Sequence, residues 1–427
     1  MKNNKLALLG GEKVIKSPFK KYNSIGKEES NAAKSVVDSG VLSQYIGGWC
    51  DDFFGGPKVK EFEAAWASHF KVKHAITVNS WTSGLVTAIG ALGIEPGDEI
   101  IVSPWTMCAS ATAILQWNAI PVFADIDPET YCIDPKSIIK NISSQTKAIM
   151  VIDIGGQSAD MDAIMKIAND NDLKVISDTA QAPGSLYKGK FTGTLAHIGG
   201  YSLNYHKHIH TGEGGVLVTN DDDLATRMRL IRNHAEAVVE KMGVTNITNM
   251  IGHNFRLGEI ESAIGIEQLK KLDNVIENRQ KIAEKLYNGL KDLKGLGLPK
   301  VRENCTHVYY MYFMTIDSNI TNVSREKIYQ ALEAEGIVGL GLSFANVHLL
   351  PVFQQKQAYG SKGFPWSSDI CKNEVSYQKG ICPVAEGLHD HNYLGFQMCM
   401  HEMDDNEVDL FINCFHKVWS NLDLLKD

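Results

Sequence analysis

Between about Lys71 and Asn220 the chain alternates short apolar runs with helical stretches, and turns separate them. This alternation is typical of strands and helices that wind into a mainly parallel sheet. Seven strands are predicted, at His74–Asn79, Glu99–Ser103, Ile120–Asp125, Lys147–Ile154, Lys174–Asp178, His197–Leu203 and Gly215–Thr219. Four helices are predicted between them, at Thr82–Leu92, Ala109–Trp117, Pro135–Ile142 and Met161–Asn169. We therefore expect an α/β fold with a mainly parallel seven-stranded sheet.

The pattern changes after this region. A long helical segment from about Leu257 to Leu293 is predicted to link two domains. Beyond it we expect a strand at 307–316, a capped helix at 324–337 that Gly336 closes, and an amphipathic helix at Asn406–Leu425. These elements suggest a smaller α+β domain. We divide the chain into an N-terminal segment with a large domain, 1–270, and a linking helix with a small domain, 271–427.

Composition excludes several classes of protein. The 427 residues carry a net charge of −8, whereas nucleic-acid binding usually shows as a basic patch. The eight cysteines include no CxxC pair, which is typical of reduced thiols in the cytoplasm. No window approaches the roughly 18 apolar residues of a membrane span, and the N-terminal segment lacks the apolar core of a signal peptide. We expect a cytoplasmic protein that binds neither membrane nor nucleic acid.

The most informative segment is GYSLNYHKHIHTGEGG, residues 200–215, in which Lys207 follows a predicted strand. The glycines after it allow backbone to approach a ligand closely. A desolvated lysine with a lowered pKa can form a Schiff base with a carbonyl compound. A single lysine in a loop is more often a surface residue, so the interpretation depends on its neighbours in the fold.

Two other strand ends support a ligand site. Asp178 ends a predicted strand and Gln181 follows it, and ligands bind at the carboxyl ends of strands in open α/β sheets. An aspartate that faces a pyridinium nitrogen is expected in pyridoxal phosphate enzymes, although an aspartate there is also a common helix cap. Ser80 opens an apolar helix, whose free N–H groups suit a phosphate.

Taken together, these segments resemble the DegT/DnrJ/EryC1/StrS family of pyridoxal phosphate-dependent sugar aminotransferases, which have the aspartate aminotransferase fold type I. The resemblance covers nearly the whole chain. It is carried by segments such as GGPKVKEFEAAWASHF, VNSWTSGLVTAIGALGIEPGDEIIVSPWT, SDTAQAPGS, YSLNYHKHIHTGEGGVLVTND and IGHNFRLGEIESAIGIEQLKKLD.

The resemblance implies a role for each matching residue. Lys207 would form the Schiff base with the cofactor and then transfer the proton, Asp178 would pair with the pyridine nitrogen, and Gln181 would hydrogen-bond the ring's 3-oxygen. The phosphate would be held by Ser80, Thr82, Ser83 and Ser202. It also implies a homodimer with shared active sites.

Two residues are implied to act near the subunit boundary. Asn254, supplied by the partner subunit, would complete the phosphate site. Arg256 would bind the carboxylate of the amino donor, because arginine binds carboxylates in a bidentate fork.

The sequence departs from the family pattern at two places. Trp81 stands where the family usually has glycine, so the phosphate turn must accommodate a large side chain. Met107 stands where an aromatic residue commonly stacks on the pyridoxal ring, and either its thioether or the neighbouring Trp105 could take that role.

Histidines flank the lysine, and some relatives are dehydratases with histidine in its place. Counting from Ser202 and from Gly212 nevertheless identifies Lys207 as the lysine position. A metal site at His206 and His208 is disfavoured, because no carboxylate or cysteine cluster lies near them in sequence. We interpret His234 and His253 as structural.

The implied reaction transfers an amino group from L-glutamate, which leaves as 2-oxoglutarate, to a keto sugar, preferably nucleotide-linked, in amino-sugar synthesis for a surface polysaccharide or glycoconjugate. A free keto-octulosonate, or a cyclitol such as scyllo-inosose, with glutamate or glutamine as donor, remains the alternative. A non-catalytic relative and an amino-acid lyase are the other hypotheses. Candidate acceptor-binding segments are Leu42–Gly56, which could equally be a dimer contact, and Phe344–Pro365.

Overall fold

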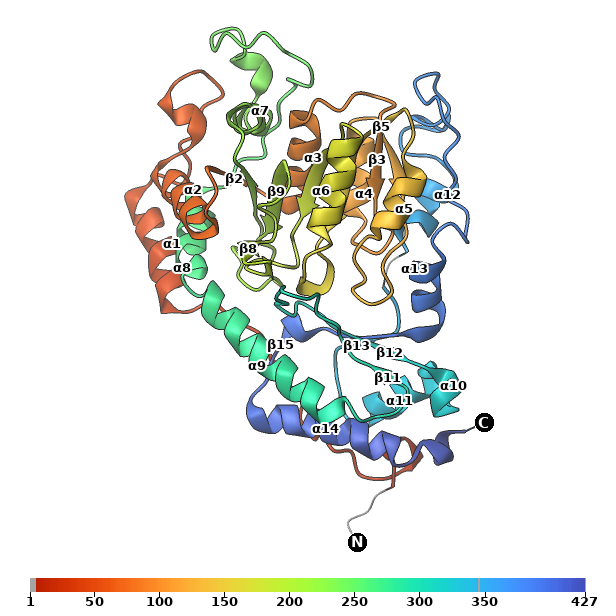
Figure 1. Cartoon of the computed structure of the whole chain (residues 1–427). Helices are drawn as coiled ribbons and strands as arrows, with labels where there is room; N and C mark the ends of the chain where they lie inside the picture. Colours follow the sequence, from red (N-terminus) through yellow and green to blue (C-terminus); the bar gives the residue numbers. More distant parts are fainter. Residues whose placement is uncertain (1–4, 345, 427) are drawn as a thin grey trace.

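The computed structural model describes residues 5–344 and 346–426, and a seven-stranded sheet forms its centre (Figure 1). The strand order is β2-β10-β9-β6-β5-β3-β4. The strands are β2 (His74–Val78), β3 (Glu99–Val102), β4 (Ile120–Phe123), β5 (Thr146–Ile152), β6 (Lys174–Asp178), β9 (Ile198–Ser202) and β10 (Gly215–Thr219). β10 is antiparallel to its neighbours β2 and β9, and the other pairs of neighbouring strands are parallel, so the predicted mainly parallel seven-stranded sheet is confirmed.

Helices cover this sheet, and acidic or hydroxyl side chains cap most of them. They are α3 (Trp81–Ala91), α4 (Ala109–Gln116), α5 (Pro135–Asn141), α6 (Met161–Asp170) and α7 (Asp222–Arg232). The Ser80 hydroxyl accepts the Ser83 N–H at the start of α3, and the aspartates before α5, α6 and α7 accept N–H groups in the same way. The four predicted helices are therefore confirmed to within one or two residues.

The segment predicted as one long linking helix is two helices, α8 (Glu259–Leu269) and α9 (Leu272–Leu290). α8 packs against α1 (Lys27–Ser39) and α2 (Pro57–Phe70), whereas α9 packs against α14 (Asp405–Trp419). The chain changes direction at Lys271, whose Nζ lies 2.6 Å from a carboxylate oxygen of buried Glu29. The prediction missed the break because it involves no glycine or proline.

A second, antiparallel sheet has the order β11-β12-β14-β13. Its strands are β11 (Leu296–Gly297), β12 (Tyr312–Ile316), β13 (Leu340–Gly341) and β14 (Tyr393–Phe396). Helix α11 (Arg325–Ala334) begins at the predicted cap Ser324 and closes at Gly336, whose φ is +104°. The predicted C-terminal helix is α14, and a short turn at Leu422–Leu425 follows it.

The second sheet has its own hydrophobic core. The inner side of α9, including Leu286, packs there with α11 and α14, while Ile276 near the start of α9 packs against the large sheet's side. The N-terminal residues Leu6, Ile15 and Phe19 also pack in the second core. Figure 1 shows α9 running from α8 to α14, and the domain boundary at residue 270 stays a prediction.

The remaining elements are short. They are β1 (Lys20–Lys21), β7 (Leu186–Tyr187), β8 (Lys190–Phe191), α10 (Ser318–Thr321), α12 (Pro351–Gln354), α13 (Pro383–Gly387) and β15 (His401–Glu402). 3-10 turns lie at Ala7–Leu9, Asp51–Phe54, Ile154–Gly156, Ala235–Ala237, Val347–Leu349 and Met398–Met400, and a π turn lies at Leu388–Asn392. Within residues 5–344 and 346–426, no helix is both long and apolar enough to cross a membrane.

Candidate active site

A cavity of about 480 Å³ lies where the carboxyl ends of β3, β6 and β9 meet residues of the second sheet. Parallel strands bring their carboxyl ends to one edge, which is why residues from distant parts of the chain gather there. The large sheet contributes Met107, Gln181 and Lys207, and the second sheet's side contributes Tyr310, Phe344 and Cys399.

Lys207 lies at this cavity with only 7% of its surface exposed. Its Nζ lies 4.4 Å from the centre of the Tyr310 ring, a cation–π contact. Burial lowers the pKa of Lys207 to about 8, and the acidic groups Cys399 and Asp178 limit that fall. The amine therefore gives up its proton more readily than an exposed lysine does, which favours a nucleophile or proton acceptor.

Asp178, the last residue of β6, is buried and well hydrogen-bonded. Its Oδ1 accepts hydrogen bonds from Trp81 Nε1 at 2.7 Å and from the Ala180 N–H at 3.2 Å, and Oδ2 accepts one from Ser110 Oγ at 2.8 Å. Burial raises the pKa of Asp178, while Ser110, Trp81, Ala180 and Lys207 oppose that rise. Asp178 and Lys207 are thus close enough to influence each other's charge, and of the two only Lys207 lines the cavity.

Gln181 lines the cavity, as Lys207 does. Its side-chain oxygen accepts the Gly155 N–H at 2.8 Å, so its amide N–H groups are what it can offer a ligand. An N–H donor suits an oxygen on an aromatic ring. The predicted grouping of Lys207, Asp178 and Gln181 fits a pyridoxal ring.

The hydroxyls predicted to bind phosphate gather at the start of α3. Ser80 Oγ accepts the Ser83 N–H at 3.1 Å, and the two hydroxyl oxygens lie 2.9 Å apart. Ser202 ends β9 and pairs with Gly215 in β10. A Cβ on Gly215 would come within 3.0 Å of the Ser80–Trp81 backbone, so Ser202 lies near that turn. Thr82, in the first turn of α3, is exposed.

Met107 and Trp105 differ in their access to the cavity. Met107 lines it and is 60% exposed. Trp105 is completely buried and stacks on Phe344, with ring centres 5.3 Å apart. Of the two predicted candidates, Met107 is the one positioned to pack against a bound ring.

Asn254 and Arg256 do not line the cavity formed by the described residues. The side chain of Asn254 is exposed, and its carbonyl lies 3.4 Å from the Asn79 side-chain nitrogen. Arg256 donates from Nε to Asn233 Oδ1 at 2.9 Å. The candidate segment Leu42–Gly56 lies beside Arg256, because a Cβ on Gly47 would be 3.7 Å from Arg256 Nη2.

The second candidate segment, Phe344–Pro365, lies partly at the cavity and partly away from it, and its Ala345 is outside the described residues. Phe344 lines the cavity at Lys207. The continuation of this segment packs along the edge of the large sheet, where Tyr359 donates to the Leu115 carbonyl at 3.0 Å.

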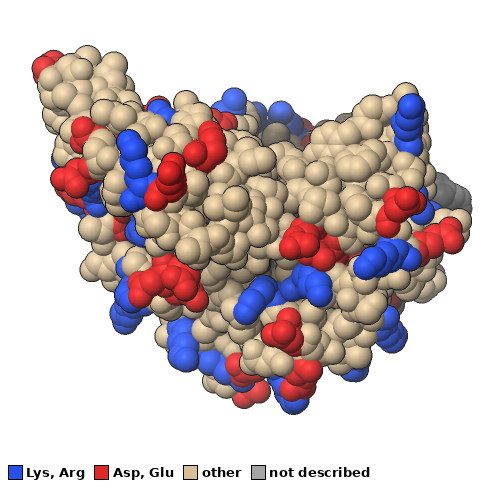
Figure 2. Space-filling view, turned by 90° about the horizontal axis from the view of Figure 1, so that it is seen from above, with Lys and Arg blue, Asp and Glu red and all other residues tan. Residues whose placement is uncertain are grey.

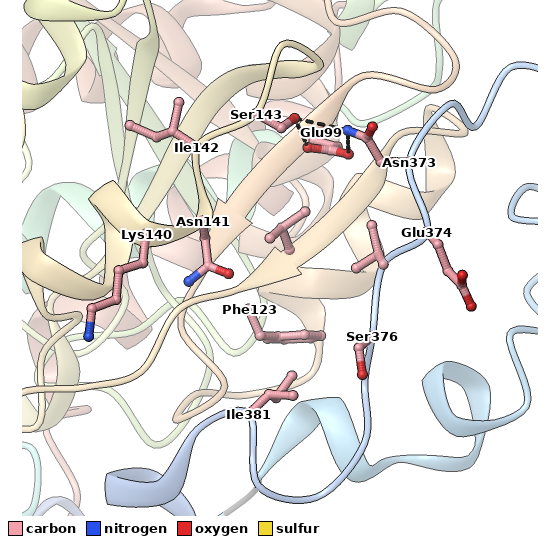
Figure 3. Close-up of a pocket in the computed structure, with 12 residues that line it drawn as sticks. Glu99, Phe123, Lys140, Asn141, Ile142, Ser143, Asn373, Glu374, Ser376 and Ile381 are labelled. Carbon is pink, nitrogen blue, oxygen red and sulfur yellow. Dashed lines mark hydrogen bonds between the residues drawn. The ribbon is translucent and has the colours of Figure 1, made fainter.

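That edge contains another cavity of about 480 Å³ (Figure 3). Figure 3 shows Ser143 and Asn373 directed at Glu99, and their hydrogen bonds to its two oxygens measure 2.5 and 2.7 Å. Because these bonds satisfy the buried carboxylate, we interpret this cavity as a structural junction.

The two histidines that flank Lys207 differ in their surroundings. His208 is buried and its Nε2 lies 2.7 Å from the Val308 carbonyl oxygen, whereas His206 lines the cavity and burial lowers its pKa to about 4. His253 stacks on Phe255 at 4.4 Å. In the part of the chain that the structure describes, no three His, Cys, Asp or Glu side chains are grouped closely enough to hold a metal ion.

Several residues of the site were not predicted. Tyr310 and Cys399 come from the second sheet's side, and Ser110 comes from α4. Periodicity shows that these residues are buried, but it does not show which distant carboxylate or amine they meet. Trp81 was recognised as unusual, yet its bond to Asp178 joins residues 97 positions apart.

Comparison with known proteins agrees with this geometry. The DegT/DnrJ/EryC1/StrS aminotransferase family matches residues 24–380. The spore coat polysaccharide biosynthesis protein SpsC of Bacillus subtilis is 34% identical, covering 82% of this chain and 89% of its own. The GDP-perosamine synthase of Caulobacter vibrioides is 36% identical, covering 70% and 79%.

A solved structure of an aminotransferase from Psychrobacter cryohalolentis superimposes with a TM-score of 0.80 at 28% identity, covering 95% of this chain and 100% of that one. Its fold and the family match agree with a buried lysine, carboxylate and amide at one sheet edge. The chain therefore belongs to the DegT/DnrJ/EryC1/StrS aminotransferase family and is a pyridoxal phosphate-dependent aminotransferase.

Proposed function

We propose that this protein transfers an amino group from L-glutamate to a keto sugar, nucleotide-linked, in cytoplasmic synthesis of an amino sugar for a surface polysaccharide or glycoconjugate. The observation that carries the proposal is a buried lysine, Lys207, at a cavity, with the buried carboxylate of Asp178 near enough to influence its pKa. The names of the relatives, spore coat polysaccharide biosynthesis and GDP-perosamine synthesis, support a sugar as acceptor.

Each residue has a chemical task in this proposal. When bound, pyridoxal phosphate supplies an electron sink that stabilises negative charge on the substrate carbon. Lys207 would hold the cofactor through its amine and would carry the proton to and from the substrate carbon, which its lowered pKa favours. Asp178 would accept a hydrogen bond from the ring N–H, and the Gln181 amide would donate one to the ring oxygen.

The residues at the start of α3 and the residues of the cavity wall have different roles in the proposal. Ser80, Thr82, Ser83 and Ser202 would hold the phosphate through their hydroxyl groups, at the start of α3 where the helix dipole favours an anion. The remaining cavity wall offers polar but uncharged groups, including Ser343 and Gln397, which suit the hydroxyls of a sugar ring.

The first test is an absorption spectrum of the purified protein before and after excess L-glutamate. We expect a violet absorption band from bound cofactor that glutamate shifts to shorter wavelength, and Lys207→Ala should abolish the shift. Acceptors are then compared: nucleotide-linked keto sugars, a free keto-octulosonate and scyllo-inosose, each with glutamate and with glutamine. A protein that binds no pyridoxal phosphate, or that transfers amine only to a cyclitol, would contradict the proposal.

The proposal includes a homodimer with shared sites. Asn254 is exposed at the surface, where its side chain is accessible to a partner subunit. Its backbone lies beside Asn79, which accepts a hydrogen bond from Ser83 of the same chain's phosphate turn. Near it, two segments expose large apolar side chains: Leu42, Ile46, Trp49, Ile247 and Ile251. Figure 2 shows a broad area without charged side chains across the middle of the face at the upper end of Figure 1.

Mixing two inactive variants tests the shared site. If Lys207 and Asn254 meet across the interface, Lys207→Ala mixed with Asn254→Ala restores one intact site in each mixed dimer. Random exchange makes half of the dimers mixed, so we expect about a quarter of wild-type activity. Lys207→Ala mixed with Asp178→Ala is the matched control, since both residues belong to one subunit's site and no activity should return. Equal recovery in both mixtures, or none in either, would contradict shared sites.

A further inference from the structure

We propose that Trp81 is a positioning residue for the cofactor site, whose indole N–H fixes the orientation of the Asp178 carboxylate and stabilises it in its charged form. This inference rests on the role of Asp178 in the proposed function.

The sequence around Trp81 is adapted to its size. Trp81 is the first residue of α3, yet it is only 6% exposed, because its indole turns inward over β9. A Cβ on Gly200 would come within 2.1 Å of the indole ring, and one on Gly84 within 2.6 Å. Two glycines therefore leave the space that the indole fills.

The same packing directs the indole at the carboxylate. Gly200 in β9 is the register partner of Asp178 in β6, so a ring lying on Gly200 is next to the end of β6. Nε1 then reaches Asp178 Oδ1 at 2.7 Å, a short distance for N–H···O and typical of a hydrogen bond to a charged oxygen.

The hydrogen bonds to Asp178 leave one acceptor position of its carboxylate unused. A carboxylate offers about four acceptor positions, two on each oxygen. Trp81 and the Ala180 N–H use Oδ1, and Ser110 uses one position of Oδ2. Among the bonds within the described residues, a second position on Oδ2 remains for a ring N–H. Trp81 thus holds Oδ1 and leaves that position on Oδ2 unused.

A buried carboxylate needs such donors. Burial disfavours the charge on Asp178, whereas Lys207 favours it. Asp153, which follows the neighbouring strand β5, repels Asp178 when it is charged, and burial raises the pKa of Asp153 to about 7. A protonated Asp178 would offer a ring N–H only a neutral oxygen, which is a weaker acceptor than a carboxylate. Removing the indole donor should therefore weaken cofactor binding most at low pH, where Asp178 would protonate first.

The test measures the dissociation constant of pyridoxal phosphate from the holoenzyme by equilibrium dialysis, at about pH 6.5 and about pH 8.5. Trp81→Phe keeps an aromatic ring and removes the donor. We expect about a tenfold weaker affinity at the lower pH, as for loss of a hydrogen bond to a charged group, and a smaller change at the higher pH. Dividing by the wild-type value at each pH removes the titration of Lys207, which both proteins share.

Trp117→Phe is the matched control. Its indole N–H donates at 2.7 Å to the Val86 carbonyl in the same helix α3 and does not touch Asp178. We expect its affinity to stay within about twofold of wild type. If Trp81→Phe does not fold, benzothienylalanine at position 81 replaces only the indole N–H by sulfur.

Asp178→Asn separates the inference from the proposal on which it rests. If Trp81 acts through Asp178, Asp178→Asn weakens binding and Trp81→Phe adds nothing in that background. The inference is overturned if Trp81→Phe weakens cofactor binding equally in the wild-type and Asp178→Asn backgrounds, or if a folded Trp81→Phe variant binds as tightly as wild type. In either case Asp178 keeps its proposed role. If Asp178→Asn itself binds pyridoxal phosphate normally, the proposed role of Asp178 fails as well.

Discussion

Replacing Lys207 by methionine should stabilise the cofactor-free protein, because burying the charged amine lowers the free energy of unfolding. Burial lowers the pKa of Lys207 from 10.5 to about 8. The folded protein therefore loses this proton at lower pH than the unfolded chain, and stability rises with pH between about 8 and 10.5. Below pH 8 the whole penalty is present, about 3 kcal/mol at roughly 1.4 kcal/mol per pKa unit.

Methionine has a similar length and no charge, so Lys207→Met removes the penalty and keeps apolar contact with Tyr310. We expect urea unfolding of the cofactor-free protein at pH 7 to show a gain of about 2 to 3 kcal/mol, which shrinks as the pH approaches 10. Lys174→Met, at an exposed position on β6, is the control and should change stability by less than about 0.5 kcal/mol. A Lys207→Met protein no more stable than wild type, or a gain independent of pH, would refute the argument that burial of the amine costs stability.

Two further substitutions test the packing. Gly200→Ala should lower the free energy of unfolding in urea by about 1 to 3 kcal/mol, because its Cβ would overlap the indole of Trp81. Adding Trp81→Ala should recover part of that loss. A Gly200→Ala protein as stable as wild type would contradict the packing argument. Lys417→Met should lower the free energy of unfolding by about 3 kcal/mol, because it leaves the buried carboxylate of Glu335 without the ammonium group at 2.8 Å. Glu335 also binds N-terminal residues, so limited proteolysis should then cut that segment. Unchanged stability and unchanged proteolysis would count against this role.

Most of the large sheet could be predicted from the sequence. Each strand is a short apolar run between turn residues, and the helices between them begin at acidic or hydroxyl caps. The break between α8 and α9 could not be predicted, because it comes from packing against α1 and α14 rather than from a local signal at Lys271. The irregular chain after Phe344 also escaped prediction, since distant residues such as Glu99 and Leu115 hold it in place.

The site was predictable where a motif places residues at consecutive strand ends, as with Asp178, Gln181 and Lys207. The part of the site where the second sheet's side meets the large sheet was not predictable. Tyr310 reaches Lys207 from the second sheet's side, and no spacing in the sequence indicates this contact. Trp81 had a local signal, its size in a turn, but that signal could not reveal Asp178 as its partner.

The cavity at Lys207 has two walls, which distant segments of the chain build. Met107, Gln181 and Lys207 follow strand ends of the large sheet, so their spacing depends on the packing of that sheet. Ser343 and Gln397 lie next to β13 and β14, which pack partly in the second core around Leu286 and, through Tyr393, partly in the core of the large sheet. In the proposed function the first wall binds the cofactor and the second meets the acceptor. Because Tyr393 joins the two cores, the two walls keep a fixed position relative to each other.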